Sequence, residues 1–159
     1  MPILSILIPV FNTRRYLAES LDSACGQTLR DIEIICLDDG STDGSAEILD
    51  ECAERDGRLK VVHKPNTGFG DTMNVGLAQA QGKYVAFLES DDFIGRDAYA
   101  ELVAAAEKSG AEIVKGNYFE FRVTERNGKR ARSASSVVVF GVMGGFIRHE
   151  RITGSFTCR

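Results

Sequence analysis

Residues 84–92 read YVAFLESDD, an apolar run that ends in three carboxylates within four residues. A short, continuous run of this kind is typical of a strand that is buried on both faces of a sheet. Crowded carboxylates repel one another unless a cation lies among them, and Mg²⁺ and Mn²⁺ prefer such hard oxygen ligands. The segment therefore predicts a buried strand followed by a metal site. The alternative is an acidic turn in which Asp91 or Asp92 caps the next helix.

Similar apolar runs recur along the chain and alternate with segments of helical periodicity. Strands are expected at residues 5–10, 31–38, 59–63, 84–88 and 112–115. Between them, apolar residues recur at helical spacing, as in Leu17, Leu21 and Ala24. This order predicts an α/β fold with a mostly parallel central sheet, helices on both faces and right-handed crossovers.

Polar residues follow the ends of three of these strands. They are Asn12, the pair Asp38-Asp39, and residues 89–92. Ligands of such sheets bind beyond the carboxyl ends of the strands, so these clusters predict one shared site. A carboxylate of the Asp38-Asp39 pair could accept a hydrogen bond from the imide N–H of uracil. Capping of the next helix by Asp39, Ser41 or Asp43 is the alternative, and both roles can coexist.

The last part of the chain differs in character from the first. Residues 118–123 and 137–140 have strand-like patterns, and Asn127-Gly128 is a strong turn signal between them. We expect a C-terminal β-hairpin added to the sheet. Its basic residues indicate either a charged edge or contact with an anionic acceptor or a membrane surface. We divide the chain into a donor-binding region, 1–117, and the start of an acceptor-side region, 118–159.

Composition restricts the class of protein. The chain has 159 residues, 43% of them hydrophobic and 26% charged, as in a soluble globular domain. The net charge of -4 argues against nucleic-acid binding. No apolar run is long enough to span a bilayer, and the N-terminus lacks the pattern of a secretory signal. The four cysteines are widely spaced, so we expect reduced thiols in a cytoplasmic protein. With only two histidines, a Ser-His-Asp hydrolase is not indicated, and His63 is expected to be structural.

Four blocks together resemble family 2 glycosyltransferases of the GT-A fold. They are SILIPVFN at 5–12, QT at 27–28, DDGSTD at 38–43 and ESDD at 89–92. Each block alone is weak, but their order and spacing match the family over about two-thirds of the chain. The resemblance implies a GT-A-type nucleotide-binding fold and an inverting sugar transfer from a nucleotide-sugar, usually a UDP-sugar, with Mn²⁺ or Mg²⁺ as cofactor.

The resemblance also implies roles for individual residues. Asp91 would bind the metal as the direct ligand, together with Glu89. Asp92 would lie near the donor sugar as the catalytic-side residue, and Asp39 would bind the uracil imide. The residues expected to bind the nucleotide are Pro9, Val10, Phe11, Asn12, Asp38, Asp39, Asn74, Glu89 and Ser90. The acceptor would be a sugar, a lipid-linked molecule or a protein, in polysaccharide or glycoconjugate synthesis in the cytoplasm or at the inner face of the membrane.

The chain departs from the family pattern at several positions. Arg14 stands where many members of the family have Glu, and Met73 where many have an Arg near the diphosphate. That positive charge is either missing here or supplied from elsewhere, with Lys64 as the candidate. The catalytic base of the family usually lies beyond this length of chain, and Glu150 is the nearby late carboxylate. We therefore expect a fragment that holds the donor half.

Two other functions remain open from the sequence. A sugar-phosphate nucleotidyltransferase would have the same kind of parallel sheet. It would also need a glycine-rich basic loop after the first strand, whereas residues 11–15 contain no glycine. A non-catalytic sugar-nucleotide-binding module would keep the fold without turnover. Arg14, Met73 and the missing base keep this second alternative open.

Overall fold

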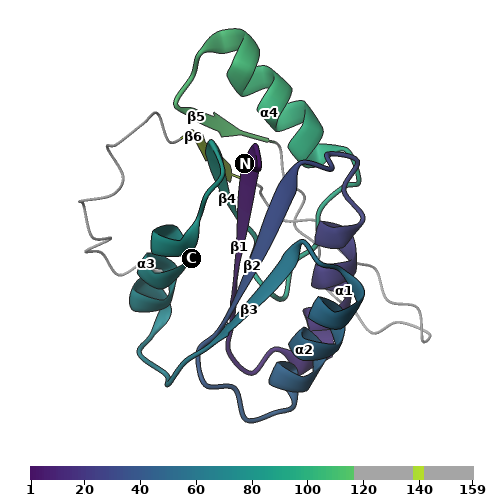
Figure 1. The fold of residues 1–159 in the computed structure, drawn as a ribbon, viewed down its shortest axis with the longest axis vertical. Helices are drawn as coiled ribbons and strands as arrows, with labels where there is room; N and C mark the ends of the chain where they lie inside the picture. The colour runs from purple at the N-terminus through teal and green to yellow at the C-terminus, as the bar shows by residue number, and fades with distance from the viewer. Residues whose placement is uncertain (117–137, 142–159) are drawn as a thin grey trace, which may run out of the picture.

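The computed structural model describes residues 1–116 and the backbone of residues 138–141. It has a six-stranded sheet with helices on both faces (Figure 1). The strands are β1 (Leu4–Val10), β2 (Ile32–Asp38), β3 (Leu59–His63), β4 (Tyr84–Phe87), β5 (Ile113–Lys115) and β6 (Val138–Gly141). The helices are α1 (Arg14–Cys25), α2 (Ser45–Arg55), α3 (Phe69–Gln79) and α4 (Ala98–Ser109). The expected α/β fold is confirmed.

The strands lie in the order β3-β2-β1-β4-β6-β5. The first four are parallel, with Leu4 of β1 opposite both Ile32 and Tyr84. The chain builds outward from β1 to β3 on one side and then returns to the other side of β1 with β4. Strand order reverses there, so the carboxyl ends of β1 and β4 form the switch point at which such sheets bind ligands.

The strand expected at residues 137–140 is confirmed as β6, which is antiparallel to both neighbours, β4 and β5. Its expected hairpin partner at 118–123, the turn Asn127-Gly128 and the basic residues around it lie outside the described residues. Glu150 also lies outside them. The boundary between the regions 1–117 and 118–159 stays a prediction.

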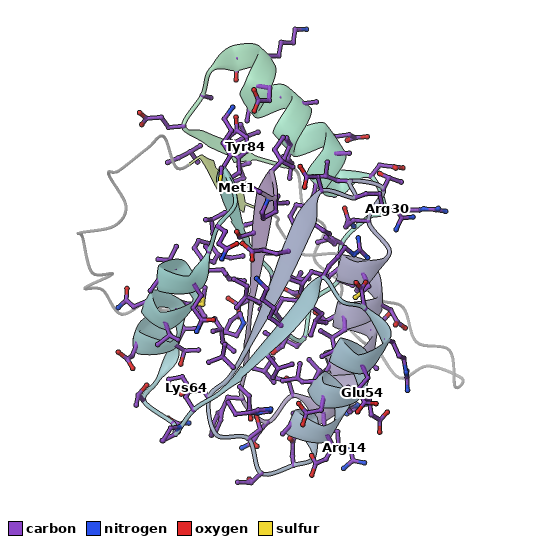
Figure 2. All side chains as sticks on the ribbon, in the orientation of Figure 1. Met1, Arg14, Arg30, Glu54, Lys64 and Tyr84 are labelled. Carbon is purple, nitrogen blue, oxygen red and sulfur yellow. The ribbon has the colours of Figure 1, made fainter. Side chains whose placement is uncertain are left out.

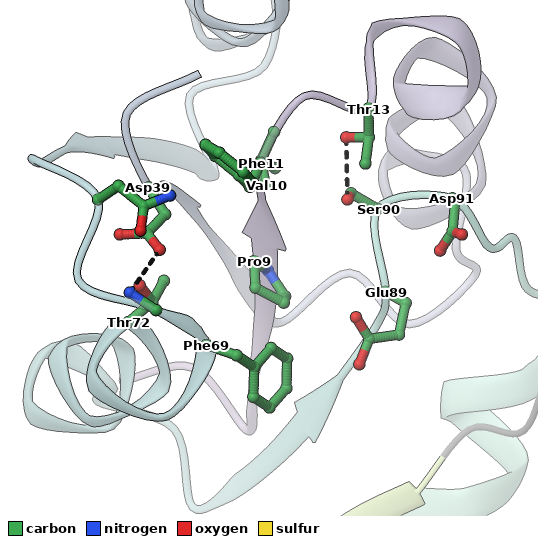
Figure 3. A pocket seen from close by; sticks show the side chains of 12 residues that line it. Pro9, Val10, Phe11, Thr13, Asp39, Phe69, Thr72, Glu89, Ser90 and Asp91 are labelled. Atoms are coloured by element: carbon green, nitrogen blue, oxygen red, sulfur yellow. Dashed lines mark hydrogen bonds between the residues drawn. The ribbon is translucent and has the colours of Figure 1, made fainter. Parts of the chain in front are cut away.

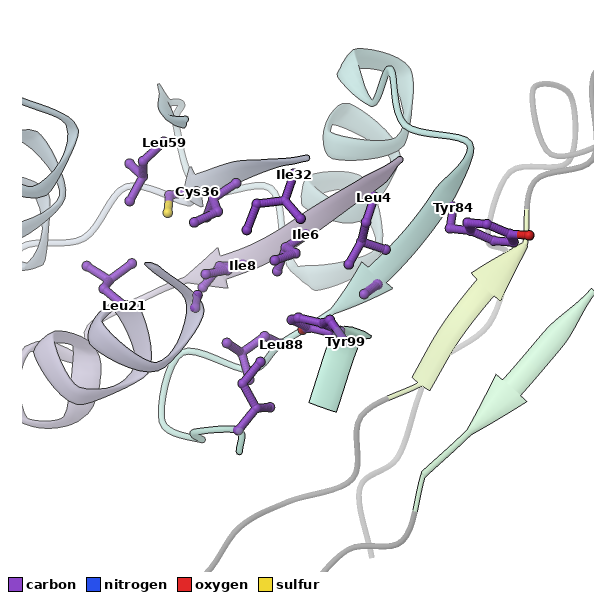
Figure 4. Packing of buried hydrophobic residues seen from close by; sticks show 14 of the residues in the cluster. Leu4, Ile6, Ile8, Leu21, Ile32, Cys36, Leu59, Tyr84, Leu88 and Tyr99 are labelled. Atoms are coloured by element: carbon purple, nitrogen blue, oxygen red, sulfur yellow. The ribbon is translucent and has the colours of Figure 1, made fainter. Parts of the chain in front are cut away.

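Alternation along the buried strands divides the core between the two faces of the sheet. Leu4, Ile6 and Ile8 of β1 belong to a cluster with residues of α1, α2 and α4, including the fully buried Tyr99 (Figure 4). Leu7, one step out of phase, packs on the other face with Met73 of α3. Helices on both faces therefore explain why these strands are almost continuously apolar. Met73 is therefore a core residue.

A buried polar cluster joins the strands at the edge opposite their carboxyl ends. The Glu33 carboxylate accepts hydrogen bonds from Ser5 Oγ at 2.6 Å, Lys60 Nζ at 2.9 Å and the Gln81 backbone N–H at 2.7 Å. Ser5 Oγ in turn accepts a hydrogen bond from the Gly82 N–H at 2.8 Å. The turn before β4 is thus held tightly against the start of β1.

Gly82 leaves no room for a side chain in this turn. A Cβ atom there would lie 2.6 Å from the Ser5 backbone nitrogen and 2.8 Å from the Leu4 carbonyl carbon. We expect Gly82→Ala to lower the free energy of unfolding by about 2 kcal/mol, because backbone atoms must move to relieve the overlap. Denaturant unfolding measures the loss. Gly57→Ala, where nothing lies within 4 Å of the added Cβ, is the control, and equal effects of the two changes would contradict this packing.

Among the described residues, no helix has both the length and the apolar character needed to cross a membrane. Cys25, Cys36 and Cys52 are free thiols, as expected, and Cys158 lies outside the described residues.

Candidate functional site

A pocket of about 490 Å³ opens at the carboxyl ends of β1 to β4. Figure 2 places Arg14 and Lys64 toward this end of the molecule and Met1 and Tyr84 toward the other. The volume lies within the range of small-molecule sites. The lining residues are Pro9, Val10, Phe11, Thr13, Asp39, Asn66, Gly68, Phe69, Thr72, Glu89, Ser90 and Asp91. The site therefore occupies the switch point between β1 and β4, with a wall from the loop before α3.

Seven of the predicted site residues lie in this pocket. They are Pro9, Val10, Phe11, Asp39, Glu89, Ser90 and Asp91. Figure 3 shows Asp39 and Thr72 on one side of Pro9, and Glu89, Ser90 and Asp91 on the other. Asn12, Asp38, Asn74 and Asp92 are not lining residues. The structure thus brings the two acidic segments to one pocket, while the roles of the individual residues stay predictions.

Asn12 holds two loops together behind the pocket. Its backbone N–H donates to Ser41 Oγ at 3.1 Å, and its side-chain oxygen accepts a hydrogen bond from the Thr42 N–H at 2.8 Å. It does so with a φ of 54°, a left-handed conformation that Asn tolerates better than most residues. Arg14 strengthens the same junction, since its backbone N–H donates to Asp43 Oδ2 at 2.9 Å. Arg14 therefore joins the β1–α1 and β2–α2 loops.

Asp38 turns away from the pocket toward β3. It is buried, accepts a hydrogen bond from the Ser41 N–H at 2.9 Å, and lies 2.9 Å from His63 Nδ1. The other ring nitrogen of His63 lies 3.1 Å from Asp50 Oδ1. His63 thus bridges two carboxylates and has the structural role expected of it. Hydrogen bonding to Asp38 and Asp50 raises the pKa of His63.

This bridge predicts a pH-dependent contribution to stability. Because the pKa of His63 is raised by folding, its contribution is fully present below the unfolded value of about 6.5 and is lost as the pH rises through the folded value. Wild type should be more stable than His63→Gln. We expect the difference in their free energies of unfolding to be largest at about pH 5.5 and smaller at about pH 8.5. Denaturant unfolding across this range measures the difference. A difference that stays constant with pH would contradict the bridge.

Asp39, the next residue, faces the pocket and the loop before α3. One carboxylate oxygen accepts hydrogen bonds from the Thr67 N–H at 2.9 Å and from the Lys64 ammonium, and the other from the Gly68 N–H at 2.9 Å. Burial raises the pKa of Asp39, but these donors and Thr72 outweigh it and lower the pKa below its usual value. A carboxylate held ionised in this way is a strong hydrogen-bond acceptor.

The contacts of Asp39 settle two earlier alternatives. Asp39 binds the N–H groups before α3, whereas α2 begins at Ser45, so Asp39 does not cap α2. Lys64 is almost buried against Asp39, with 11% of its side chain exposed, and its ammonium also donates to Thr72 Oγ1 at 3.0 Å. Lys64 is not a lining residue, so its predicted role beside a diphosphate is not supported.

The acidic turn forms the opposite wall. Thr13 Oγ1 donates to Ser90 Oγ at 3.0 Å, which joins the start of α1 to the turn. Partial desolvation raises the pKa of Glu89, and the negative charges of Asp91 and Asp92 add to this shift. Helix α4 begins only at Ala98, so capping of the next helix by Asp91 or Asp92 is wrong as an explanation of this turn.

The chemistry of the pocket fits a divalent cation that is shared with a phosphate ligand. Within residues 1–116 and 138–141, no group of three or more His, Cys, Asp or Glu side chains is arranged to hold a metal ion. Three of the twelve lining residues carry carboxylates. None of the described lining residues is Lys or Arg. A diphosphate would therefore need a cation beside it. Mg²⁺ is commonly held by one or two carboxylates together with substrate phosphates, which Asp91 and Glu89 match.

Five lining residues were missed from the sequence. They are Thr13, Asn66, Gly68, Phe69 and Thr72. The available signal was the loop at 66–70, which follows β3 and therefore opens at the same edge of the sheet as the acidic segments. Phe69 is 44% exposed and Phe11 50%, so two aromatic rings are partly open to solvent at this pocket.

An α/β sheet with a pocket at its switch point is the arrangement found in doubly wound nucleotide-binding folds. The chain belongs to glycosyl transferase family 2, whose sequence model matches residues 5–157. The resemblance inferred from the four sequence blocks is thereby confirmed, and membership argues against the nucleotidyltransferase alternative.

Curated relatives agree with this family. The chain is 36% identical over 120 residues to the uncharacterized glycosyltransferase EpsJ of Bacillus subtilis, covering 76% of this chain and 35% of that protein. It is 35% identical over 126 residues to the glycosyltransferase GlyG of Streptococcus pneumoniae, covering 79% of this chain and 42% of that protein. The chain thus spans less than half the length of these two relatives.

Among solved structures, residues 1–349 of TarS from S. aureus, in complex with UDP, match with a TM-score of 0.66 and 27% identity. The match covers 82% of this chain and 38% of that one. This likeness and the family membership together confirm the expected GT-A-type fold.

Proposed function

We propose that the chain forms the donor-binding part of an inverting glycosyltransferase that uses a UDP-sugar and Mn²⁺ or Mg²⁺. The observation that carries this proposal is the placement of Asp39 and the turn Glu89–Asp91 on opposite sides of one pocket. One side offers an ionised acceptor for a base, and the other offers carboxylates for a cation on the diphosphate.

The choice of uracil rests on Asp39. Uracil presents an imide N–H, which can donate a hydrogen bond to an ionised carboxylate. The TarS structure that this chain resembles binds UDP, which supports the same donor class. Phe11, half-exposed at the pocket, offers a ring face for the base.

Asp91 and Glu89 would hold the cation, and Asp92 would lie beside the donor sugar. When bound, the cation neutralises charge that develops on the departing diphosphate. The chain itself supplies the base contact, the hydroxyls of Thr13 and Ser90, and a partly desolvated wall. Deprotonation of the acceptor hydroxyl needs a catalytic base, for which Glu150, outside the described residues, stays a candidate.

We place the acceptor among sugars, lipid-linked molecules and proteins, in polysaccharide or glycoconjugate synthesis. The proposed location is the cytoplasm or the inner face of the membrane. The free thiols Cys25, Cys36 and Cys52 support a reducing compartment.

Calorimetry with UDP tests the donor site. The chain should bind UDP in Mn²⁺ and bind it at least about tenfold more weakly in EDTA, because the acidic wall then faces an uncompensated diphosphate. CDP is the comparison ligand and should bind more weakly than UDP, because cytosine has no N–H at N3 to donate to Asp39. Absence of UDP binding in both buffers would overturn the proposal. UDP binding without sugar transfer by the full-length protein would favour the non-catalytic module.

A further inference from the structure

Helix α1 and the turn after it carry a row of polar side chains that faces the segment 89–99. Thr13, Ser20, Ser23 and Gln27 recur at intervals that place them along one side of this helix. Each of them has a hydrogen bond to the segment that begins with the acidic turn. Residues 88–97 contain no helix or strand. Their position therefore depends on contacts with the neighbouring element.

Gln27 makes the most of these contacts. It is fully buried, and its amide nitrogen donates to the Gly95 carbonyl at 2.7 Å and to the Ser23 carbonyl at 3.0 Å. Its amide oxygen accepts a hydrogen bond from the Tyr99 N–H at 3.2 Å. Both N–H donors are used, as a buried amide requires. One side chain thus joins the end of α1, the middle of the segment and the start of α4.

The serines attach the segment closer to the acidic turn. Ser20, also fully buried, donates from Oγ to the Glu89 carbonyl at 3.3 Å. Ser23 Oγ accepts a hydrogen bond from the Ile94 N–H at 3.2 Å. Beyond Gln27, the Thr28 N–H donates to the Arg96 carbonyl at 2.9 Å. The backbone is therefore held on both sides of Ser90, Asp91 and Asp92.

We infer that Gln27, with Ser20 and Ser23, is a positioning residue for the acidic turn, fixing where Asp91 and Glu89 present their carboxylates. This inference rests on the proposed function. The three side chains are not lining residues of the pocket, so they act through the backbone that they hold. Outer-shell partners of this kind orient the groups that contact a metal. The Gln27-Thr28 block of the sequence thereby acquires a function that neither residue type signals alone.

Gln27→Met tests this role, because it keeps a side chain of similar length and removes the three hydrogen bonds. The first readout is the metal-linked gain, the ratio of UDP affinity in Mn²⁺ to that in EDTA. The second is the affinity for uridine, which lacks the diphosphate. The third is hydrogen exchange of the Ile94 and Tyr99 amides in the free protein. Ser5→Ala is the matched control, since Ser5 is equally buried and hydrogen-bonded at the opposite edge of the sheet.

We expect Gln27→Met to reduce the metal-linked gain about tenfold, as loss of outer-shell partners does, and to speed exchange at Ile94 and Tyr99. Uridine affinity should not change, and Ser5→Ala should alter none of these readouts. If Gln27→Met does not fold, Ser23→Ala, which removes the Ile94 contact and the hydrogen bond from Ser23 Oγ to the Ser20 carbonyl, should show the same pattern at smaller size.

Two results separate the inference from the function on which it rests. Wild-type chain that binds no UDP would overturn the proposed function, whatever the exchange data show. If the wild-type chain binds UDP and Gln27→Met shows the same metal-linked gain as wild type, only the positioning role is overturned. An equal loss of uridine affinity would also overturn it, because the change would then act on the whole pocket.

Discussion

Replacing Asp91 with Asn should weaken Mn²⁺-dependent UDP binding by about 100-fold, because loss of a direct ligand should cost at least as much as loss of an outer-shell partner, which costs roughly 10- to 100-fold. Asp91 lies in the pocket wall, where no Lys or Arg is among the described lining residues. Removing its charge takes away a ligand for the cation and leaves Glu89 as the remaining carboxylate of that wall. Calorimetry with UDP in Mn²⁺ and in EDTA measures the change.

The position of Asp91 makes this prediction separable from a folding defect. Asp91 is exposed, so Asp91→Asn should leave the melting temperature close to that of wild type. Glu54→Gln removes an exposed carboxylate of α2 that does not line the pocket, and serves as the control for net charge. If Asp91→Asn and Glu54→Gln bind UDP equally well in Mn²⁺, Asp91 is not the metal ligand.

Asp39→Asn should be the most destabilising of the site substitutions, by about 3 kcal/mol, because it leaves a nearly buried ammonium without its counter-ion. The side chains of Lys64 and Asp39 are only 11% and 7% exposed. The same change should abolish measurable uridine binding, since an amide offers one acceptor atom where two were used. Denaturant unfolding measures the first effect and calorimetry the second.

The double variant Asp39→Asn/Lys64→Met separates these two effects. Without the ammonium, the cost of an unpaired buried charge disappears, so the double variant should be more stable than Asp39→Asn. Uridine binding should remain lost, because the base acceptor is still missing. A double variant less stable than Asp39→Asn would contradict the ion pair, and one that regains uridine binding would contradict the role of Asp39.

The order of strands and helices was predictable because apolar runs buried on both faces differ strongly from the amphipathic helices between them. The placement of the acidic segments at one edge followed from the parallel topology alone. The expected ends of β1 to β3 agree with the structure to within about a residue, since polar clusters follow them. The strand expected at residues 118–123 stays a prediction, because these residues lie outside the described part of the chain.

Neighbouring residues could not be separated from sequence. Asp38 ends β2 and Asp39 follows it, and consecutive side chains at a strand end point in opposite directions. Asp38 therefore meets His63, and Asp39 meets the loop before α3. Which of the two faces the pocket depends on partners about 25 residues away, which periodicity does not reveal. The ion pair between Lys64 and Asp39 was missed for the same reason, because it joins two different loops.

A crystal structure of the chain with UDP and Mn²⁺ tests the central claim most directly. The account predicts uracil against Asp39 and Phe11, the diphosphate along the Glu89–Asp91 wall, and Mn²⁺ bound by Asp91. Nucleotide bound elsewhere, or in this pocket with Mn²⁺ away from Asp91 and Glu89, would contradict it.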